Sequence, residues 1–155
     1  MTWQEQLTQW RFDRNLTEPT DAYIFMMNEE SEEAKAAEST YELIDALADL
    51  IVLTTNQAAL EQSTLDFTQR QVVEPLPELL AQYQLGNDNS SIFQQIYAGC
   101  SLAIYQLGFA LDKVMLETVK EISSRTGAMD ESTGKWTKFT TPEAQALWYK
   151  ADYST

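Results

Sequence analysis

Apolar positions recur at intervals of three and four residues over most of the chain, which is the spacing of one face of an α-helix. Only 5 Gly and 4 Pro interrupt the 155 residues, so long stretches contain no helix breaker. The pattern therefore predicts a single all-α domain over residues 1–155. Four principal helices are expected over residues 3–14, 20–37, 40–62 and 92–124, with a shorter helix after Pro77.

The second and third of these helices are separated by a very short loop, which predicts an antiparallel hairpin. The sequence Ser39-Thr40-Tyr41-Glu42 matches a capping box and marks the start of the third helix. After Gly127 the composition changes to small and polar residues mixed with aromatic ones. Residues 127–155 are therefore expected to form an extended, irregular C-terminal tail.

The charge of the chain is strongly negative and unevenly distributed. Its 24 acidic and 10 basic residues give a formal net charge of −14, which repels nucleic acid. Nine of the carboxylates fall within residues 21–49, whereas six of the ten basic residues lie from Lys113 onward. We expect no nucleic-acid partner. The segregation is consistent with a site that takes cations in one part and phosphate groups in another.

The chain has one cysteine, Cys100, in an apolar stretch, and it has no histidine. An intramolecular disulfide, a histidine-based triad and a histidine metal site are therefore excluded. The first residues mix charged with apolar side chains and lack a signal-peptide core, and no apolar run reaches the roughly 18 residues of a membrane helix. We expect a cytoplasmic protein with no membrane contact.

Two acidic pairs face each other across the predicted hairpin. Glu30 with Glu33, and Glu42 with Asp45, are each three residues apart and so share a helix face. If the turn centres between residues 37 and 38, the two pairs lie level and their carboxylates converge. Converging negative charges repel one another, and a bound cation removes the repulsion. Oxygen ligands alone favour a hard ion, Mg²⁺ with Mn²⁺ as a substitute, that shares a phosphorylated ligand.

Acidic runs of this kind also fit a solvated helix face, and Glu42 has another role as the third residue after the cap Ser39. Asp45 and Asp49 fit that alternative less well, because they interrupt an otherwise apolar run.

The order of these acids resembles a known family. Glu29, Glu30 and Glu33, followed by Glu42 and Asp45, resemble the EExxE and ExxD motifs of MazG-like pyrophosphohydrolases. The sequence DALADLIVL, which ends the motif, is similar to phage-type members of that superfamily. The resemblance covers residues 20–60 well. It implies a MazG-like helical bundle that hydrolyses a nucleoside triphosphate, dGTP or dATP by the phage-type likeness, to the monophosphate and pyrophosphate.

The resemblance also implies roles for individual residues. Glu29 would orient or deprotonate the attacking water, although Glu32 is an alternative for that position. The interval between Glu33 and Glu42 is short for the family, which leaves open whether Glu42 or Asp49 completes the metal site. The residues expected to hold the metal are Glu30, Glu33, Glu42, Asp45 and Asp49.

Substrate contacts are sought among the basic and aromatic residues. Lys113 and Lys120 lie seven residues apart on one face of a predicted helix and are candidates for phosphate binding. Each lysine is also a common solvated surface residue, and each tryptophan is common in cores or interfaces. The further candidates are Arg125, Lys135 and Lys138 for the phosphates and Trp10 and Trp136 for stacking on the base.

Family members pair, so the resemblance implies a homodimer or homotetramer, with the apolar residues 92–116 as a suitable interface. A phage-encoded member would act in the host cytoplasm. Two alternatives remain: an acidic, non-enzymatic DNA mimic that binds a basic partner, and a related all-α phosphoribosyl-ATP pyrophosphohydrolase. A DNA mimic needs carboxylates spread over an exposed surface, whereas here they cluster among apolar positions.

Overall fold

The computed structural model describes residues 1–133 and 135–154, and for Lys135 it describes only the backbone. This part of the chain is mostly helical, as predicted, but it has seven helices and one short sheet rather than four principal helices. The elements in chain order are α1 (Trp3–Asp13), α2 (Ala22–Ala36), α3 (Thr40–Leu60), α4 (Leu76–Ala81), α5 (Ser90–Gln106), α6 (Leu111–Ser123), β1 (Gly127–Asp130), β2 (Lys135–Lys138) and α7 (Pro142–Gln145).

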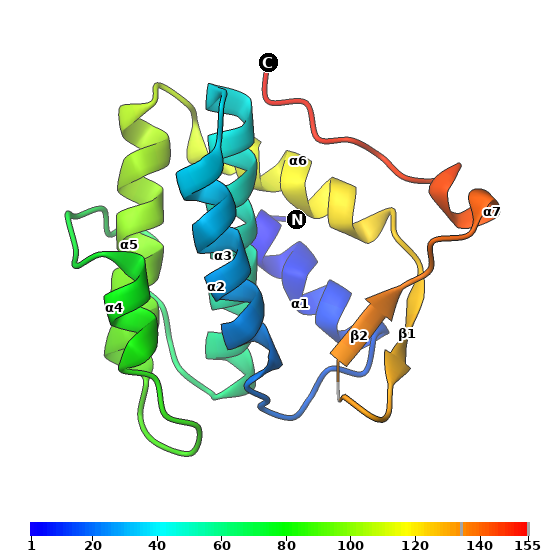
Figure 1. Cartoon of the computed structure of the whole chain (residues 1–155), viewed down its shortest axis with the longest axis horizontal. Helices are drawn as coiled ribbons and strands as arrows, with labels where there is room; N and C mark the ends of the chain where they lie inside the picture. Colours follow the sequence, from blue (N-terminus) through cyan, green and yellow to red (C-terminus); the bar gives the residue numbers. More distant parts are fainter. Residues whose placement is uncertain (134, 155) are drawn as a thin grey trace.

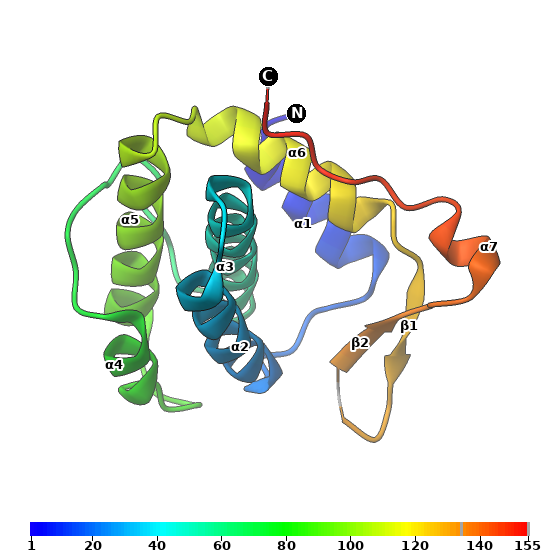
Figure 2. The ribbon, with the colours of Figure 1, turned by 45° about the horizontal axis from the view of Figure 1, so that its top comes forward.

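The α2–α3 hairpin is the framework of the fold (Figure 1). It forms as predicted because Ser39 caps α3: its hydroxyl accepts a hydrogen bond from the Glu42 N–H over 3.1 Å. Helix α3 lies in the middle of the molecule and packs against α2, α5, α1 and α6, as the second view also shows (Figure 2). By length and composition α3 could cross a membrane, but 78% of its apolar window is buried inside the fold, as in the core helix of a soluble protein.

The prediction of one helix over residues 92–124 is wrong, because the chain turns between α5 and α6. Gly108 adopts a φ of 89°, and the N–H groups of Gly108 and Phe109 donate to the carbonyls of Tyr105 and Ile104 over 3.0 and 3.3 Å. These two bonds end α5 in a Schellman motif, for which glycine is the favoured residue. The predicted interface over residues 92–116 is therefore not one continuous helical face.

The C-terminal residues are more ordered than the sequence predicts. Strands β1 and β2 pair antiparallel, with Gly127 opposite Lys138, and they lie beside the C-terminal end of α1 (Figure 1). A Cβ atom on Gly127 would come within 2.2 Å of the Thr137 carbonyl oxygen, so this close approach requires glycine. After α7, residues 146–154, here called the C-terminal segment, run back along α6 (Figure 2).

Candidate functional site

Three helices bring five carboxylates close enough for their charges to interact. Helix α2 contributes Glu30 and Glu33, α3 contributes Asp45 and Asp49, and α6 contributes Glu121. Glu33 is exposed, Glu30, Asp45 and Asp49 are half-buried, and Glu121 is only 3% exposed. Asp45 and Asp49 are one helical turn apart, so both face the same side of α3.

These carboxylates repel one another in a partly desolvated place. Burial, followed by the negative charges of Asp49, Glu33 and Asp45, raises the pKa of Glu30 to about 9. Burial and the charges of Asp45 and Glu121 likewise raise the pKa of Asp49 to about 8. One carboxylate oxygen of Glu30, Oε2, is buried without a hydrogen-bond partner. Glu30 and Asp49 therefore retain their protons at neutral pH, although the positive charge of Arg125 partly offsets the shift at Asp49.

The donor set of the cluster consists of oxygen atoms alone, which suits Mg²⁺ or Mn²⁺. The unpartnered Oε2 of Glu30 is an acceptor that a cation would satisfy. Within the described part of the chain, however, no three Asp, Glu or Cys side chains are arranged around one point as metal ligands. The cluster thus fits a divalent cation by its chemistry, and ligation requires these side chains to turn toward one another.

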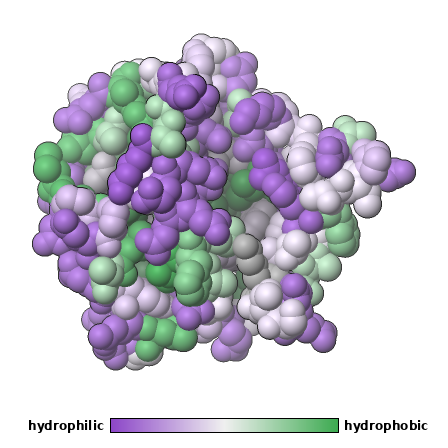
Figure 3. Space-filling view, in the orientation of Figure 1, coloured by the Kyte–Doolittle hydropathy of each residue, from purple (hydrophilic) through white to green (hydrophobic). Residues whose placement is uncertain are grey.

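A cavity of about 380 Å³ opens beside Glu30 and Asp49. Hydrophilic side chains gather over α2, and a hollow separates them from the side of the molecule that carries β1 and β2 (Figure 3). The cavity is lined by acidic, aromatic and basic side chains. Its lining includes Glu30 and Asp49, Trp10 and Trp136, Arg125 and Lys138, and the apolar and polar residues Tyr23, Met26, Val52, Leu53, Asn56, Ile122 and Thr137.

The two tryptophans of the lining come from α1 and β2. The rings of Trp10 and Trp136 meet edge to face, with centroids 6.1 Å apart. The Arg14 guanidinium carbon lies 4.5 Å from the Trp10 ring and 4.8 Å from the Trp136 ring. The Nε1 donor of Trp10 is buried without a hydrogen-bond partner. Trp10 and Trp136 thus bring flat aromatic surfaces to the cavity lining, and Arg14 lies over both rings.

A second, smaller cavity of about 270 Å³ borders Asp45. It is lined by Glu42 and Asp45 from α3 and by residues of the C-terminal segment, including Lys150 and Tyr153. The hydroxyl of Tyr153 donates a hydrogen bond to Asp45 Oδ1 over 3.2 Å. Burial raises the pKa of Asp45, while the positive charge of Lys150 lowers it, so this side of the cluster is partly neutralised.

The structure separates the two candidates left open by the sequence. Glu42 Oε2 accepts a hydrogen bond from the Glu38 N–H over 3.0 Å, so its carboxylate takes part in capping α3. Asp49 instead lines the larger cavity beside Glu30. Glu29 is exposed on α2, and Glu32 is exposed and paired with Lys35 over 3.4 Å.

The basic candidates divide in a similar way. Lys138 and Arg125 line the larger cavity. Its lining also includes Trp10, Trp136, Glu30 and Asp49. Lys113 and Lys120 are exposed on α6 and belong to the described lining of neither cavity. The Lys120 ammonium lies 4.1 Å from the centre of the Tyr149 ring. The side chain of Lys135 is outside the described residues.

Sequence reasoning missed Glu121, Lys150 and Tyr153. A signal for Glu121 exists: it follows Val114 and Thr118 on the apolar stripe of α6, where a carboxylate is unexpected. Nothing in the local pattern predicts that residues 150 and 153 return to the carboxylates. No protein-family model matches the chain, and no curated protein or solved structure matches it. The function is therefore argued from the site itself.

Proposed function

We propose that the chain is a Mg²⁺-dependent nucleoside triphosphate pyrophosphohydrolase, which cleaves a nucleoside or deoxynucleoside triphosphate to the monophosphate and pyrophosphate. One observation carries the proposal: the lining of a single cavity of about 380 Å³ includes both the carboxylates Glu30 and Asp49 and the aromatic rings of Trp10 and Trp136. A nucleoside triphosphate with its metal ion carries the matching groups, namely a planar base and a cation-bearing polyphosphate. Arg125 and Lys138 in the same lining suit its phosphate oxygens.

The metal would be held by Glu30, Glu33, Asp45 and Asp49, with Mn²⁺ able to replace Mg²⁺. When bound, it would neutralise and align the phosphate groups. Glu42 is the weaker ligand candidate because its Oε2 already accepts the Glu38 N–H. Half-burial of Glu30, Asp45 and Asp49 supports this role, because a carboxylate that only solubilises a helix is normally exposed.

The hydrolytic step needs a base for one water molecule. Glu29 is proposed for this role, because it is exposed on α2 one turn before Glu33. The water oxygen forms a bond to the α-phosphorus, its proton passes to the carboxylate, and the bond from the α-phosphorus to the bridging oxygen breaks. Pyrophosphate leaves with that oxygen, and no covalent enzyme intermediate is required.

Trp10 and Trp136 in the cavity lining supply aromatic rings on which a base can stack, which favours a nucleotide substrate over a bare polyphosphate. The preference for dGTP or dATP is part of the proposal and rests on the phage-type likeness of the sequence. Assembly into a homodimer or homotetramer is proposed on the same ground, and α5 does leave Tyr105 58% exposed.

The test is pyrophosphate release from a panel of ribo- and deoxynucleoside triphosphates and phosphoribosyl-ATP, with Mg²⁺ and with chelator. The variants are Glu30→Gln, which keeps the side-chain size, and Glu38→Gln, which removes an exposed carboxylate from the same hairpin. We expect metal-dependent release that Glu30→Gln abolishes and Glu38→Gln retains. Pyrophosphate release from phosphoribosyl-ATP alone would identify that compound as the substrate instead. If folded wild type releases no pyrophosphate from any of these compounds, the acidic, non-enzymatic DNA mimic is the better account.

A further inference from the structure

Glu121 is a buried carboxylate that holds two cations and the C-terminal segment at once. Its Oε2 lies 3.6 Å from Arg125 and its Oε1 lies 3.6 Å from the Lys150 ammonium. Oε1 also accepts a hydrogen bond from the Ala151 N–H over 3.0 Å. These contacts join the last turn of α6 to a segment about 30 residues further along the chain.

Stability alone is a poor reason for this carboxylate. A buried ion pair is often no more stabilising than a well-packed apolar residue of similar volume, because both charges lose their hydration. The negative charge of Glu121 also opposes ionisation of Asp45 and Asp49. Glu121 therefore adds repulsion to the cluster, and what it contributes in return is the placement of Arg125 and Lys150.

The two cations line different cavities beside the α3 carboxylates. Arg125 lines the larger cavity together with Asp49, while Lys150 lines the smaller cavity together with Asp45. The Lys150 side chain is 79% exposed, so its ammonium keeps donors for a ligand while it stays near Glu121. A polyphosphate placed along Asp45 and Asp49 would meet one cation at each end.

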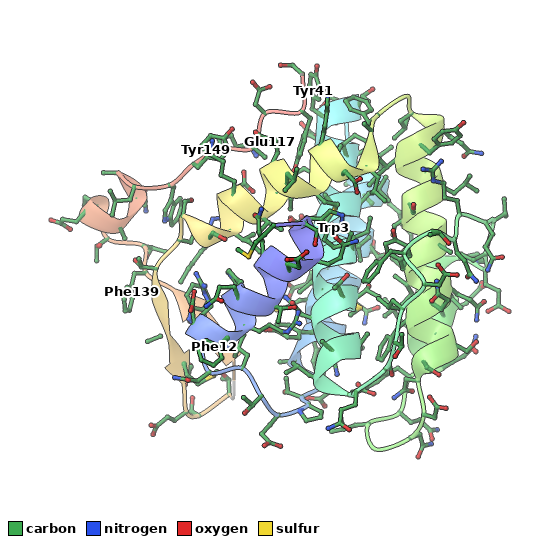
Figure 4. All side chains as sticks on the ribbon, turned by 180° about the vertical axis from the view of Figure 1, so that it is seen from behind. Trp3, Phe12, Tyr41, Glu117, Phe139 and Tyr149 are labelled. Atoms are coloured by element: carbon green, nitrogen blue, oxygen red, sulfur yellow. The ribbon has the colours of Figure 1, made fainter. Side chains whose placement is uncertain are left out.

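The C-terminal segment has a second attachment that provides a comparison. One turn before Glu121 on α6, Glu117 accepts hydrogen bonds from the Tyr149 hydroxyl and, over 2.8 Å, from the Asp152 N–H. Figure 4 shows Tyr149 close to Glu117 on the outer side of α6. Glu117 forms no ion pair with Arg125 or Lys150 among the described contacts. Both glutamates thus hold the C-terminal segment against α6, but only Glu121 also pairs with Arg125 and Lys150.

We infer that Glu121 is a positioning residue, which holds Lys150 of the C-terminal segment as a second phosphate-binding cation in addition to Arg125. This role rests on the proposed nucleotide hydrolysis at the same site. Lys150 contacts the phosphate groups that will leave as pyrophosphate, and Glu121 acts on them only through the two cations.

The experiment measures kcat and KM for the best nucleotide, together with inhibition by pyrophosphate, in full-length variants. In Lys150→Met we expect KM and the pyrophosphate inhibition constant to rise about tenfold, with kcat within about twofold, because an exposed contact to phosphate is lost. Glu121→Gln should raise KM to a similar degree and lower kcat, since Arg125 is also released. In the double variant, KM should equal that of Glu121→Gln, because both changes remove the same contact.

Two controls separate this role from a merely structural one. Glu117→Gln loosens the same segment, and Lys35→Met removes an exposed lysine from α2; both should keep the wild-type KM and pyrophosphate inhibition. An unchanged KM in Lys150→Met, or equal effects of Glu117→Gln and Glu121→Gln, would overturn the inference while the proposed function stands. Wild type that is inactive on every nucleotide would overturn both.

Discussion

The hydroxyl of Tyr153 donates a hydrogen bond to Asp45 Oδ1 over 3.2 Å and lies 2.9 Å from the Thr118 hydroxyl. The contact spans 108 sequence positions and ties the C-terminal segment to the carboxylates of α3. The aromatic ring is buried. Tyr153 therefore closes the smaller cavity and restrains the Asp45 side chain.

Replacing Tyr153 by Phe keeps the buried ring and removes the hydroxyl. Asp45 loses one donor and Thr118 keeps only its hydrogen bond to the Val114 carbonyl, so the free energy of unfolding should fall by about 1–3 kcal/mol. Urea denaturation followed by circular dichroism measures the change. Tyr105→Phe is the matched control, because Tyr105 is exposed and its ring contact with Arg70 survives. Equal unfolding free energies for Tyr153→Phe and wild type would show that the two hydrogen bonds do not stabilise the fold.

The raised pKa values of Glu30 and Asp49 predict how stability depends on pH without divalent cations. Their pKa values in the folded chain are about 9 and about 8, above the values of 4.5 and 3.8 for the free groups. The folded state therefore holds protons that the unfolded state has lost. The contribution of these two groups to the free energy of unfolding is largest below about pH 4. It falls as the pH rises toward their folded-state pKa values of about 8 and about 9.

Thermal unfolding at about pH 6 and about pH 8.5 tests this dependence, with Asp49→Asn as the comparison, since that side chain does not titrate. The melting temperature of wild type should fall between these two pH values, and that of Asp49→Asn should fall less. Mg²⁺ should restore wild type more at the higher pH, because the ionised carboxylates bind it. Parallel pH dependences of the two proteins, each insensitive to Mg²⁺, would contradict the account of the cluster.

Gly99 and Val73 predict a steric requirement outside the site. A Cβ atom on Gly99 of α5 would come within 2.6 Å of Val73 Cγ2, in the segment that leads to α4. Gly99→Ala should therefore destabilise the fold by about 1–3 kcal/mol through overpacking, despite the higher helix propensity of alanine. Val73→Ala removes the clashing Cγ2 atom. Gly99→Ala should therefore cost much less stability when it is added to Val73→Ala than when it is added to wild type. A Gly99→Ala protein as stable as wild type would show that the segment shifts freely.

Replacing Trp136 should weaken nucleotide binding, whereas replacing Phe139 should not. Trp136 lines the larger cavity, whereas Phe139 is exposed beyond the end of β2, as Figure 4 shows. Since stacking of a base on an aromatic ring contributes about 1–3 kcal/mol, Trp136→Leu should raise the nucleotide KM by roughly 5- to 100-fold. Phe139→Leu should leave KM unchanged. Steady-state kinetics measures both, and equal KM values would place the base elsewhere.

The hairpin of α2 and α3 could be predicted because its signals are local. Ser39 caps α3 within a short stretch of sequence, and the acidic residues follow helical spacing. The break before α6 could not be predicted from the same kind of signal. A glycine inside a helical pattern is compatible both with a helix that continues and with one that ends in a C-terminal cap. In the structure α5 ends at Gln106, and Gly108 adopts a positive φ.

The site could be predicted in part for a related reason. Glu30 and Asp49 belong to adjacent helices of one hairpin, so their proximity follows from chain order. Glu121, Lys150 and Tyr153 reach the same place only through packing of α6 and the return of the C-terminal segment. Contacts over such sequence separations leave no periodic signal in one sequence.

The most direct test of the proposed function is ³¹P NMR of the products formed from the best nucleotide with Mg²⁺. The account predicts equal amounts of nucleoside monophosphate and pyrophosphate from wild type, with neither product when the metal is chelated or Glu30 is replaced by Gln. Formation of nucleoside diphosphate and orthophosphate, or an unchanged triphosphate with folded wild type and Mg²⁺, would contradict it.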